Sequence, residues 1–266
     1  MRRVVHAELI RLLRRRTILI AAAGSLVFTV IATLTVFSNA RASGPGAAGP
    51  ARDAGTTVAA LGGHGGGTQA FATGASFVGF LVFVTFIALM ATEFSGGTFR
   101  ALVLRDPHRL RVIVGKLCGA LLVAAGVVAL CEVGTFGLSL LVAPTKDVPT
   151  SAWFSLAGLG SGLHDFGTVF AGVAGWAVFG TTLGVTFRSA PLALGVGFAW
   201  AGPFEHIVVD SWTAGDRFFP GLVLESLIRG GTVDVGLGRA VATAALYTGI
   251  AAVTALVLVS RRDVTA

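Results

Sequence analysis

Few residues of this 266-residue chain could do acid–base or metal chemistry. The candidates are Glu132, the adjacent pair Glu205 and His206, and the pair His164 and Asp165. Carboxylates and imidazoles are the usual general acids and bases, and both also bind zinc. Their spacing matches neither the HExxH pattern nor an acidic metal cluster, and no nucleophile motif accompanies them. We therefore predict no catalytic residue, no metal site and no cofactor in this chain, and keep an enzyme only as an alternative.

Two short fragments are similar to nucleotide-binding motifs but lack their context. The stretch FSGGTF at 94–99 contains Ser-Gly-Gly, which is a fragment of an ATPase signature sequence. Gly115 and Lys116 are followed by Leu117, so the Gly-Lys-Ser/Thr ending of a phosphate-binding loop is missing. We expect any ATP and Mg²⁺ to be bound by another chain.

The composition explains why chemistry is so sparse. Hydrophobic residues make up 54% of the chain and charged residues only 12%, against about 25% in soluble domains. Several apolar runs reach the roughly 20 residues that cross a bilayer as a helix. The sequence predicts an all-α integral membrane protein with six spans, at 17–38, 74–92, 112–143, 167–187, 190–209 and 240–260. The first run is too long for the core of a signal peptide, although Ala40-x-Ala42 follows it.

The segments between the spans have their own patterns. Residues 2–15 alternate Arg with Val and Leu at helical spacing, which predicts a basic amphipathic helix at the membrane interface. The Gly- and Ala-rich residues 41–72 predict a flexible loop in which His64 is incidental. The segment FFPGLVLESLIRGG at 218–231 is too short to span and predicts a re-entrant or interfacial helix before the last span. Pro203 should kink the fifth span.

The charge distribution predicts the orientation. Six spans place both termini on one side, and that side carries fourteen Lys and Arg residues against six on the other. The termini and residues 93–116 are therefore expected to be cytoplasmic, with the chain in the cytoplasmic (inner) membrane. The net charge of +7 does not indicate nucleic-acid binding, because the arginines flank apolar runs and form no continuous basic face.

Residues 93–116 contain residues that end and begin helices, which a simple connecting loop does not require. Gly96-Gly97 ends the second span, and Thr98 is suited to cap a new helix. Phe99, Leu102 and Val103 share one face of that helix. An apolar face in the cytosol predicts a protein partner.

The same segment then returns to the membrane. Asp106 can cap the next helix, with Pro107 at its first position. Arg109, Arg111 and Lys116 mark the membrane boundary.

This run, Glu93…Gly97-Thr98-x-Arg100…Pro107-x-Arg109…Lys116, resembles the cytoplasmic loop of ABC-2 type transporter permeases. In that family the loop carries a coupling helix that docks on a separate ATPase subunit. The resemblance implies a coupling helix at 98–104 and assigns docking to five residues, Thr98, Phe99, Arg100, Leu102 and Val103. It places Glu93 at the membrane-side entry, paired with Arg100, and gives the return into the membrane to Pro107, Arg109 and Lys116. The sequence departs from the pattern at Gly96-Gly97, which leaves the start of the helix open.

The resemblance extends to the architecture and implies a function. Residues 2–15 are similar to the family's elbow helix, and the short helix before the last span is similar to its re-entrant segment. The implied function is the membrane-spanning permease subunit of an ATP-driven exporter of an amphiphile, such as a drug, antibiotic, peptide or lipid. The implied partners are an ABC ATPase subunit and a second permease copy or related permease, with membrane lipids around them and no nucleic acid.

The intramembrane polar residues leave alternatives open. Glu132 either lines a pathway or contacts another helix, or it lies near the outer headgroups. Glu205 and His206 either line a cavity opened by Pro203 or lie at the outer interface. An ion-gradient-driven transporter that uses Glu132 is the alternative to the ATP-driven reading, although no inverted repeat is evident between the two halves.

Overall fold

The computed structural model describes residues 2–40, 56–105, 108–232 and 234–261. The α-helices of this described part are α1 (Arg2–Leu12), α2 (Arg15–Asn39), α3 (Val58–Leu61), α4 (Gln69–Ser95), α5 (Thr98–Arg105), α6 (Arg109–Val142), α7 (Leu156–Phe187), α8 (Ala190–Ala199), α9 (Glu205–Ser211), α10 (Pro220–Ile228) and α11 (Leu237–Arg261). Shorter helical turns join them at Ala143–Lys146, Ser151–Phe154, Trp200–Phe204 and Thr213–Arg217.

Six segments are long and apolar enough to cross a membrane. They are Arg15–Asn39, Gln69–Ser95, Arg109–Lys146, Leu156–Phe187, Ala190–Ser211 and Leu237–Arg261. Each overlaps one of the six predicted spans, so the prediction of an all-α, multi-pass membrane protein is confirmed.

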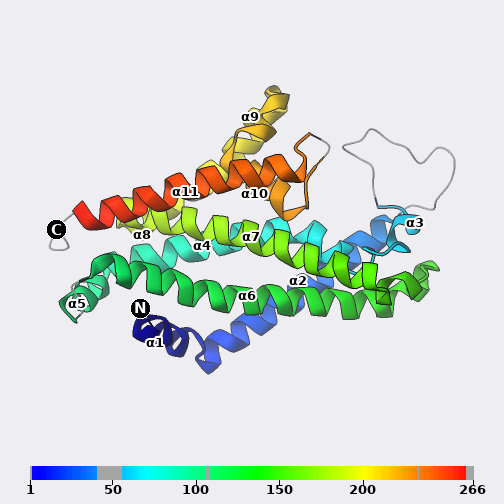
Figure 1. Ribbon diagram of the computed structural model, residues 1–266, viewed down its shortest axis with the longest axis horizontal. Coiled ribbons are helices and arrows are strands. Elements are labelled where there is room, and N and C mark those ends of the chain that lie inside the picture. Colours follow the sequence, from blue (N-terminus) through cyan, green and yellow to red (C-terminus); the bar gives the residue numbers. More distant parts are fainter. Residues whose placement is uncertain (1, 41–55, 106–107, 233, 262–266) are drawn as a thin grey trace.

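The long helices lie side by side along one axis (Figure 1). Helix α7 is central and contacts α4, α6, α8, α10 and α11, while α2 packs on α6 and α4. Helices α1 and α5 lie toward the same end of the bundle as the end of α11, and α3 lies at the other end (Figure 1). We call these the α5 end and the α3 end.

Glycines bring the two central helices close together. A Cβ atom at Gly180 would lie 2.6 Å from the Phe83 carbonyl oxygen, and one at Gly184 would lie 2.6 Å from the Met90 Cβ. The two glycines are four residues apart on α7, so together they form a flat strip against α4. Small residues let two helix backbones approach closely, and such packing helps helices to associate in lipid, where no hydrophobic effect acts between them.

Helix α7 begins eleven residues before the predicted span at 167–187, so the loop that the predicted spans leave at 144–166 is helical from residue 156 onward. The Ser155 hydroxyl accepts a hydrogen bond from the Gly158 amide at 3.0 Å and caps the helix. The Gly-rich sequence LAGLGSGLHDFG has low helix propensity, so the sequence pattern alone does not predict this part of the helix. Helices α6 and α7, with 34 and 32 residues, are each about 50 Å long and exceed the roughly 30 Å hydrocarbon core.

The predicted flexible loop at 41–72 is corrected for residues 56–72, and residues 41–55 lie outside the described residues. The Trp153 indole donates a hydrogen bond to the Leu61 carbonyl at 2.8 Å. A Cβ atom at Gly67 would lie 2.6 Å from the Phe136 ring. The His64 Nδ1 lies 2.9 Å from the Ser155 hydroxyl. The glycines therefore allow tight packing at the α3 end, and His64 makes a structural contact.

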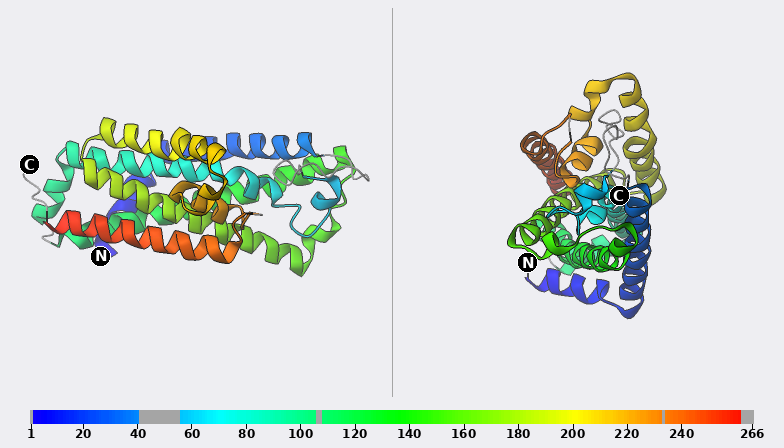
Figure 2. Two further views of the ribbon diagram at one scale, coloured as in Figure 1. Left: turned by 90° about the horizontal axis from the view of Figure 1, so that it is seen from above. Right: turned by 90° about the vertical axis from the view of Figure 1, so that its right-hand side faces the viewer.

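Two elements leave the common axis. Helix α1 lies across it, as the end-on view shows (Figure 2, right). The fifth span bends through a π-helical turn at Trp200–Phe204 that contains Pro203, and α9 then diverges from the bundle (Figure 1). Proline is a usual cause of such a bend, because it removes a backbone hydrogen bond.

We expect Gly184→Leu to lower the free energy of unfolding in detergent by about 1–3 kcal/mol or more, because the new side chain would push α7 away from α4. Thermal unfolding followed by circular dichroism measures this. Gly137→Leu is the matched control, since a Cβ atom at Gly137 on α6 would meet no atom within 4 Å. Equal stabilities of the two variants would contradict this account of the α4–α7 contact.

Candidate functional site

Four charged side chains from three helices meet toward the α5 end. The Lys116 ammonium on α6 lies 2.6 Å from Glu93 Oε1 on α4 and 3.0 Å from Glu8 Oε2 on α1. The Arg11 guanidinium lies 2.7 Å from Glu93 Oε1 and 2.5 Å from Glu8 Oε1. These four residues, named here the ionic cluster, tie the crosswise helix α1 to two of the long helices.

The ionic cluster is balanced and largely buried. Its two acids and two bases give no net formal charge, and Lys116 is only 4% exposed. Burial opposes the charged guanidinium of Arg11, but the carboxylates of Glu8 and Glu93 outweigh this and raise the pKa of Arg11. The close approach of α1 to α6 requires a glycine at position 119, since a Cβ atom there would lie 2.9 Å from the Glu8 Cβ.

The structure corrects two sequence expectations here. Glu93 pairs with Arg11 and Lys116 instead of Arg100, which is exposed on α5. Lys116 does not point outward, as a lysine that contacts headgroups would, because its ammonium lies against two buried carboxylates. The sequence contains a signal for this pairing. Lys116 lies seven residues inside an apolar helix and needs an acidic partner, and Glu8 is the lone acid of the basic helix at the start of the chain.

Helix α5 matches the predicted coupling helix in its limits but not in its exposed face. Phe99 is 2% exposed and packs with Val112, Ile113, Val185 and Val259 from α6, α7 and α11. Leu102 and Val103 are partly buried against the same cluster. The apolar face expected to await a partner is therefore covered by the chain's own helices.

The opposite side of α5 is open. Arg100 is exposed and Leu104 is 80% exposed, and the two are four residues apart on one helix face. We call Arg100, Ala101 and Leu104 the outer face of α5. An exposed leucine next to an exposed arginine, outside any span, is the part of α5 that a partner can reach.

The junctions of α5 differ in detail from the prediction. The Thr98 hydroxyl donates to the Glu93 carbonyl at 3.1 Å and so joins α5 to the end of α4, where a helix cap was expected. Gly97 turns the chain with a φ of 71°, a conformation that suits glycine. Asp106 and Pro107 lie outside the described residues, and α6 begins at Arg109.

Aromatic contacts link α5 to the end of α7. The rings of Phe94 and Phe99 lie 4.5 Å apart, and the Arg188 guanidinium lies 5.3 Å from the Phe94 ring centroid. A cation over an aromatic ring is attracted by the ring's negative face. The turn after α7 therefore contacts Phe94, which in turn packs on Phe99 of α5.

Glu132 lies far from the ionic cluster, toward the α3 end. It is sixteen residues beyond Lys116 on α6, which is about 24 Å along the helix. Its Oε1 faces α7 at Gly162, and Asp165 is its nearest charged neighbour. Asp165 accepts a hydrogen bond from Thr68 at 2.6 Å. The separation is close to the thickness of a hydrocarbon core, so Glu132 and the ionic cluster lie toward opposite ends of the bundle.

Glu205 has a structural role. It is fully buried, and its carboxylate accepts hydrogen bonds from the amides of Gly221 at 3.3 Å and Leu222 at 3.1 Å. These amides begin α10, where a carboxylate satisfies free donors and favours the helix dipole. Glu205 thus fixes α10 to α9 and is not free for substrate chemistry.

His206 belongs to a second, more open group. Its Nε2 lies 3.6 Å from Glu225 Oε1, and Arg229 lies 3.5 Å from Glu225 Oε2. The Arg229 guanidinium also donates to Ser76 on α4 at 3.2 Å. Burial raises the pKa of Glu225, and the nearby His206 and Arg229 oppose that rise. Glu205 and His206 are neighbours in sequence but contact different partners, and Glu132 lies apart from both.

The geometry offers no assembled chemistry in the described part of the chain. No three His, Cys, Asp or Glu side chains of the described residues lie close enough to hold a metal ion. A cavity of about 460 Å³ near the α3 end is lined by His164, Asp165 and Arg229 among mostly small residues. The best-built polar feature is the ionic cluster, and it is a mechanical junction between α1, α4 and α6.

We expect Lys116→Met to lower the free energy of unfolding by about 3–5 kcal/mol, since it leaves two buried carboxylates with only Arg11. Arg111→Met, an exposed arginine on the same helix, should change it by less than about 0.5 kcal/mol. Adding Glu8→Gln to Lys116→Met should restore part of the loss, because the remaining Arg11 and Glu93 balance. Thermal unfolding in detergent tests all three, and a Lys116→Met protein as stable as Arg111→Met would refute the role of the cluster.

Comparison with known proteins gives no further assignment: no family model matches the chain, and no curated protein matches it.

Proposed function

We propose that the chain is the membrane-spanning permease subunit of an ATP-binding-cassette exporter, with ATP hydrolysed by a separate ATPase subunit. The observation that carries the proposal is helix α5. It joins two spans at the end of the bundle where α1 and the end of α11 also lie (Figure 1). Its outer face is exposed, and its inner face is packed on other helices.

The anchoring supports a role in force transmission. A helix that receives a push must move with the spans and not slide over them. Phe99 is set among residues of α6, α7 and α11, and the Thr98 hydroxyl bonds to the last turn of α4. Glu93 of the ionic cluster directly precedes Phe94 in α4. The cluster therefore joins α1 and α6 to the part of α4 that packs on α5. Displacement of α5 would therefore move four spans and the crosswise helix together.

The docking residues are revised by this packing. The ATPase contacts the outer face of α5, at Arg100, Ala101 and Leu104, while Phe99, Leu102 and Val103 hold α5 in place. The α5 end is then cytoplasmic, in agreement with the excess of Lys and Arg at that end. A second permease subunit completes the transporter, and the cargo is an amphiphile exported across the cytoplasmic membrane.

We expect the pair of changes Arg100→Glu and Leu104→Glu to reduce the ATPase activity that co-purifies with the tagged chain by roughly tenfold or more, as for charge reversal at a docking hot spot. The matched control is Lys146→Glu with Leu156→Glu at the α3 end, where Leu156 is 88% exposed. The control should keep the activity. Absence of any ATPase from the wild-type preparation would refute the proposal.

The ion-gradient alternative rests on Glu132, whose neighbour Asp165 gives a pair of half-buried carboxylates. Under the ATP-driven proposal, Glu132→Gln should leave transport into sealed vesicles dependent on ATP and close to the wild-type rate. Transport that runs on an imposed pH gradient without ATP, and that Glu132→Gln abolishes, would favour the alternative.

A further inference from the structure

We propose that a groove between α1, α2 and α6 binds one acyl chain of a membrane phospholipid whose anionic head group rests on the arginines at the α1–α2 turn. The groove has a volume of about 270 Å³. Its wall is apolar except for Thr17 and is formed by Leu9, Leu12, Leu13, Ile18, Ala21, Ala22, Leu122, Val123, Gly126, Val127 and Leu130. We name it the lipid groove. This inference needs only that the chain spans a membrane and does not depend on the proposed export function.

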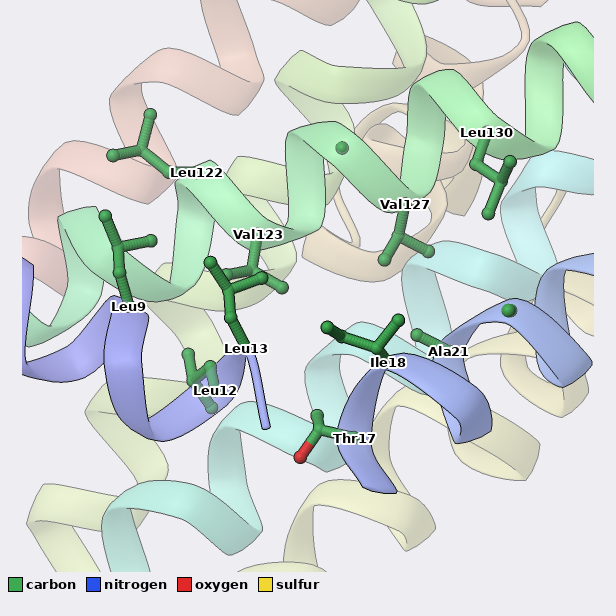
Figure 3. A pocket seen from close by; sticks show the side chains of 12 residues that line it. Leu9, Leu12, Leu13, Thr17, Ile18, Ala21, Leu122, Val123, Val127 and Leu130 are labelled. Carbon is green, nitrogen blue, oxygen red and sulfur yellow. The ribbon is translucent and has the colours of Figure 1, made fainter. Parts of the chain in front are cut away.

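The lining comes from three helices that meet at an angle. Leucines of α1, Ile18 of α2 and the side chains of Val123 and Val127 on α6 point toward one common space (Figure 3). Because α1 lies across the bundle while α2 and α6 run along it, a space remains at the place where the three helices meet. The space between them is left open on the side away from the core.

The depth of the groove suits a hydrocarbon chain. Its α6 residues run from Leu122 to Leu130, which lie about 9 to 21 Å beyond Lys116 along the helix. That range is inside the hydrocarbon core if the ionic cluster marks its edge. An apolar cavity of about 150 Å³ already binds benzene, so this groove has room for a longer apolar segment. Water is a poor occupant, because a buried water needs two to four polar partners.

The open mouth is built from exposed residues of all three helices. Leu13, Ile18, Leu122 and Leu130 are each about half exposed. A Cβ atom at Gly126 would meet no atom within 4 Å. In a membrane, such a surface is in contact with lipid, so the occupant most available to it is an acyl chain.

Charge at one end of the groove selects the head group. Arg14, Arg15 and Arg16 follow directly on the lining residue Leu13, and all three are exposed. The described structure gives these three arginines no acidic partner. The nearest acid in sequence, Glu8, is already paired with Arg11 and Lys116. Basic clusters beside a membrane helix attract anionic phospholipids, and the groove holds one such lipid in a fixed place.

The test counts lipids on the intact chain by native mass spectrometry. The purified protein is exposed to phosphatidylglycerol or to phosphatidylcholine with matched acyl chains. We expect one tightly held phosphatidylglycerol per chain and no comparable phosphatidylcholine. Gly126→Phe, which fills the groove, should remove that lipid. Gly137→Phe, at an equally exposed and open glycine of α6 outside the groove, should keep it.

A second set of variants tests the head-group contact without filling the groove. Arg14→Gln with Arg15→Gln should weaken phosphatidylglycerol retention roughly 30-fold, from the usual contribution of two basic side chains at an anionic surface. Arg2→Gln with Arg3→Gln removes the same charge at the far end of α1 and should have a smaller effect.

Three outcomes would overturn the proposal. Equal retention of the two lipids would mean unselective lipid around the protein. Retention by Gly126→Phe equal to wild type would place the lipid elsewhere. Loss of a dimer instead of a lipid in Gly126→Phe would make the groove a contact between two copies of the chain. If Gly126→Phe fails to elute as a single species, the lipid comparison on the wild type and the arginine variants decides.

Discussion

The buried charge of Lys116 determines how α1, α4 and α6 are joined at the α5 end of the molecule. Lys116 stands seven residues inside an apolar helix, and an unpaired ammonium there is costly. Its cost is offset only if carboxylates reach it in good geometry. Glu93 supplies one from the last turns of α4, and Glu8 supplies the other from α1. Satisfying this single charge therefore fixes where three helices lie.

The position of α5 follows from that junction. Because the end of α4 is held beside α6, the chain leaving α4 can turn at Gly97 and lay Phe99 into the space between α6, α7 and α11. The helix is then one rigid part of the bundle end, with its outer face free. The same physics acts at α10, where the buried Glu205 satisfies the first amides of the helix. In both places a carboxylate locates a short helix that has too few turns to fix itself.

Packing within the membrane divides the molecule into a tight centre and a loose margin. Glycines at 180 and 184 let α7 press against α4, and Trp176, Phe83 and Ile228 fill the space beside them. The helices at the margin, α2, α8 and α11, expose many apolar side chains. These outer helices are stable in a membrane because lipid chains cover their apolar surfaces. The same surfaces are therefore available to lipids or to another subunit. The lipid groove lies at this margin, where α1 crosses the packed helices α2 and α6.

The sequence alone determined the features that depend on local pattern. Apolar runs of bilayer length determine a helical membrane protein with six spans, since lipid leaves helices as the way to satisfy the backbone of such runs. The limits of α5 and the bend at Pro203 also follow from neighbouring residues. The Gly-rich start of α7 and the structure of residues 56–72 do not follow from local pattern, because tertiary contacts at the α3 end hold segments whose own propensities are weak.

Only the tertiary structure decided which polar residues pair. Glu8, Glu93 and Lys116 are separated by 85 and 23 residues, and no sequence period connects them. The pairing of Glu93 with Arg100 was expected because Arg100 is near in sequence, yet α5 carries that side chain outward. Likewise, Phe99 belongs to the core because four helix ends converge on it. Charge pairing and burial depend on distances in space, and these are set by how the helices cross.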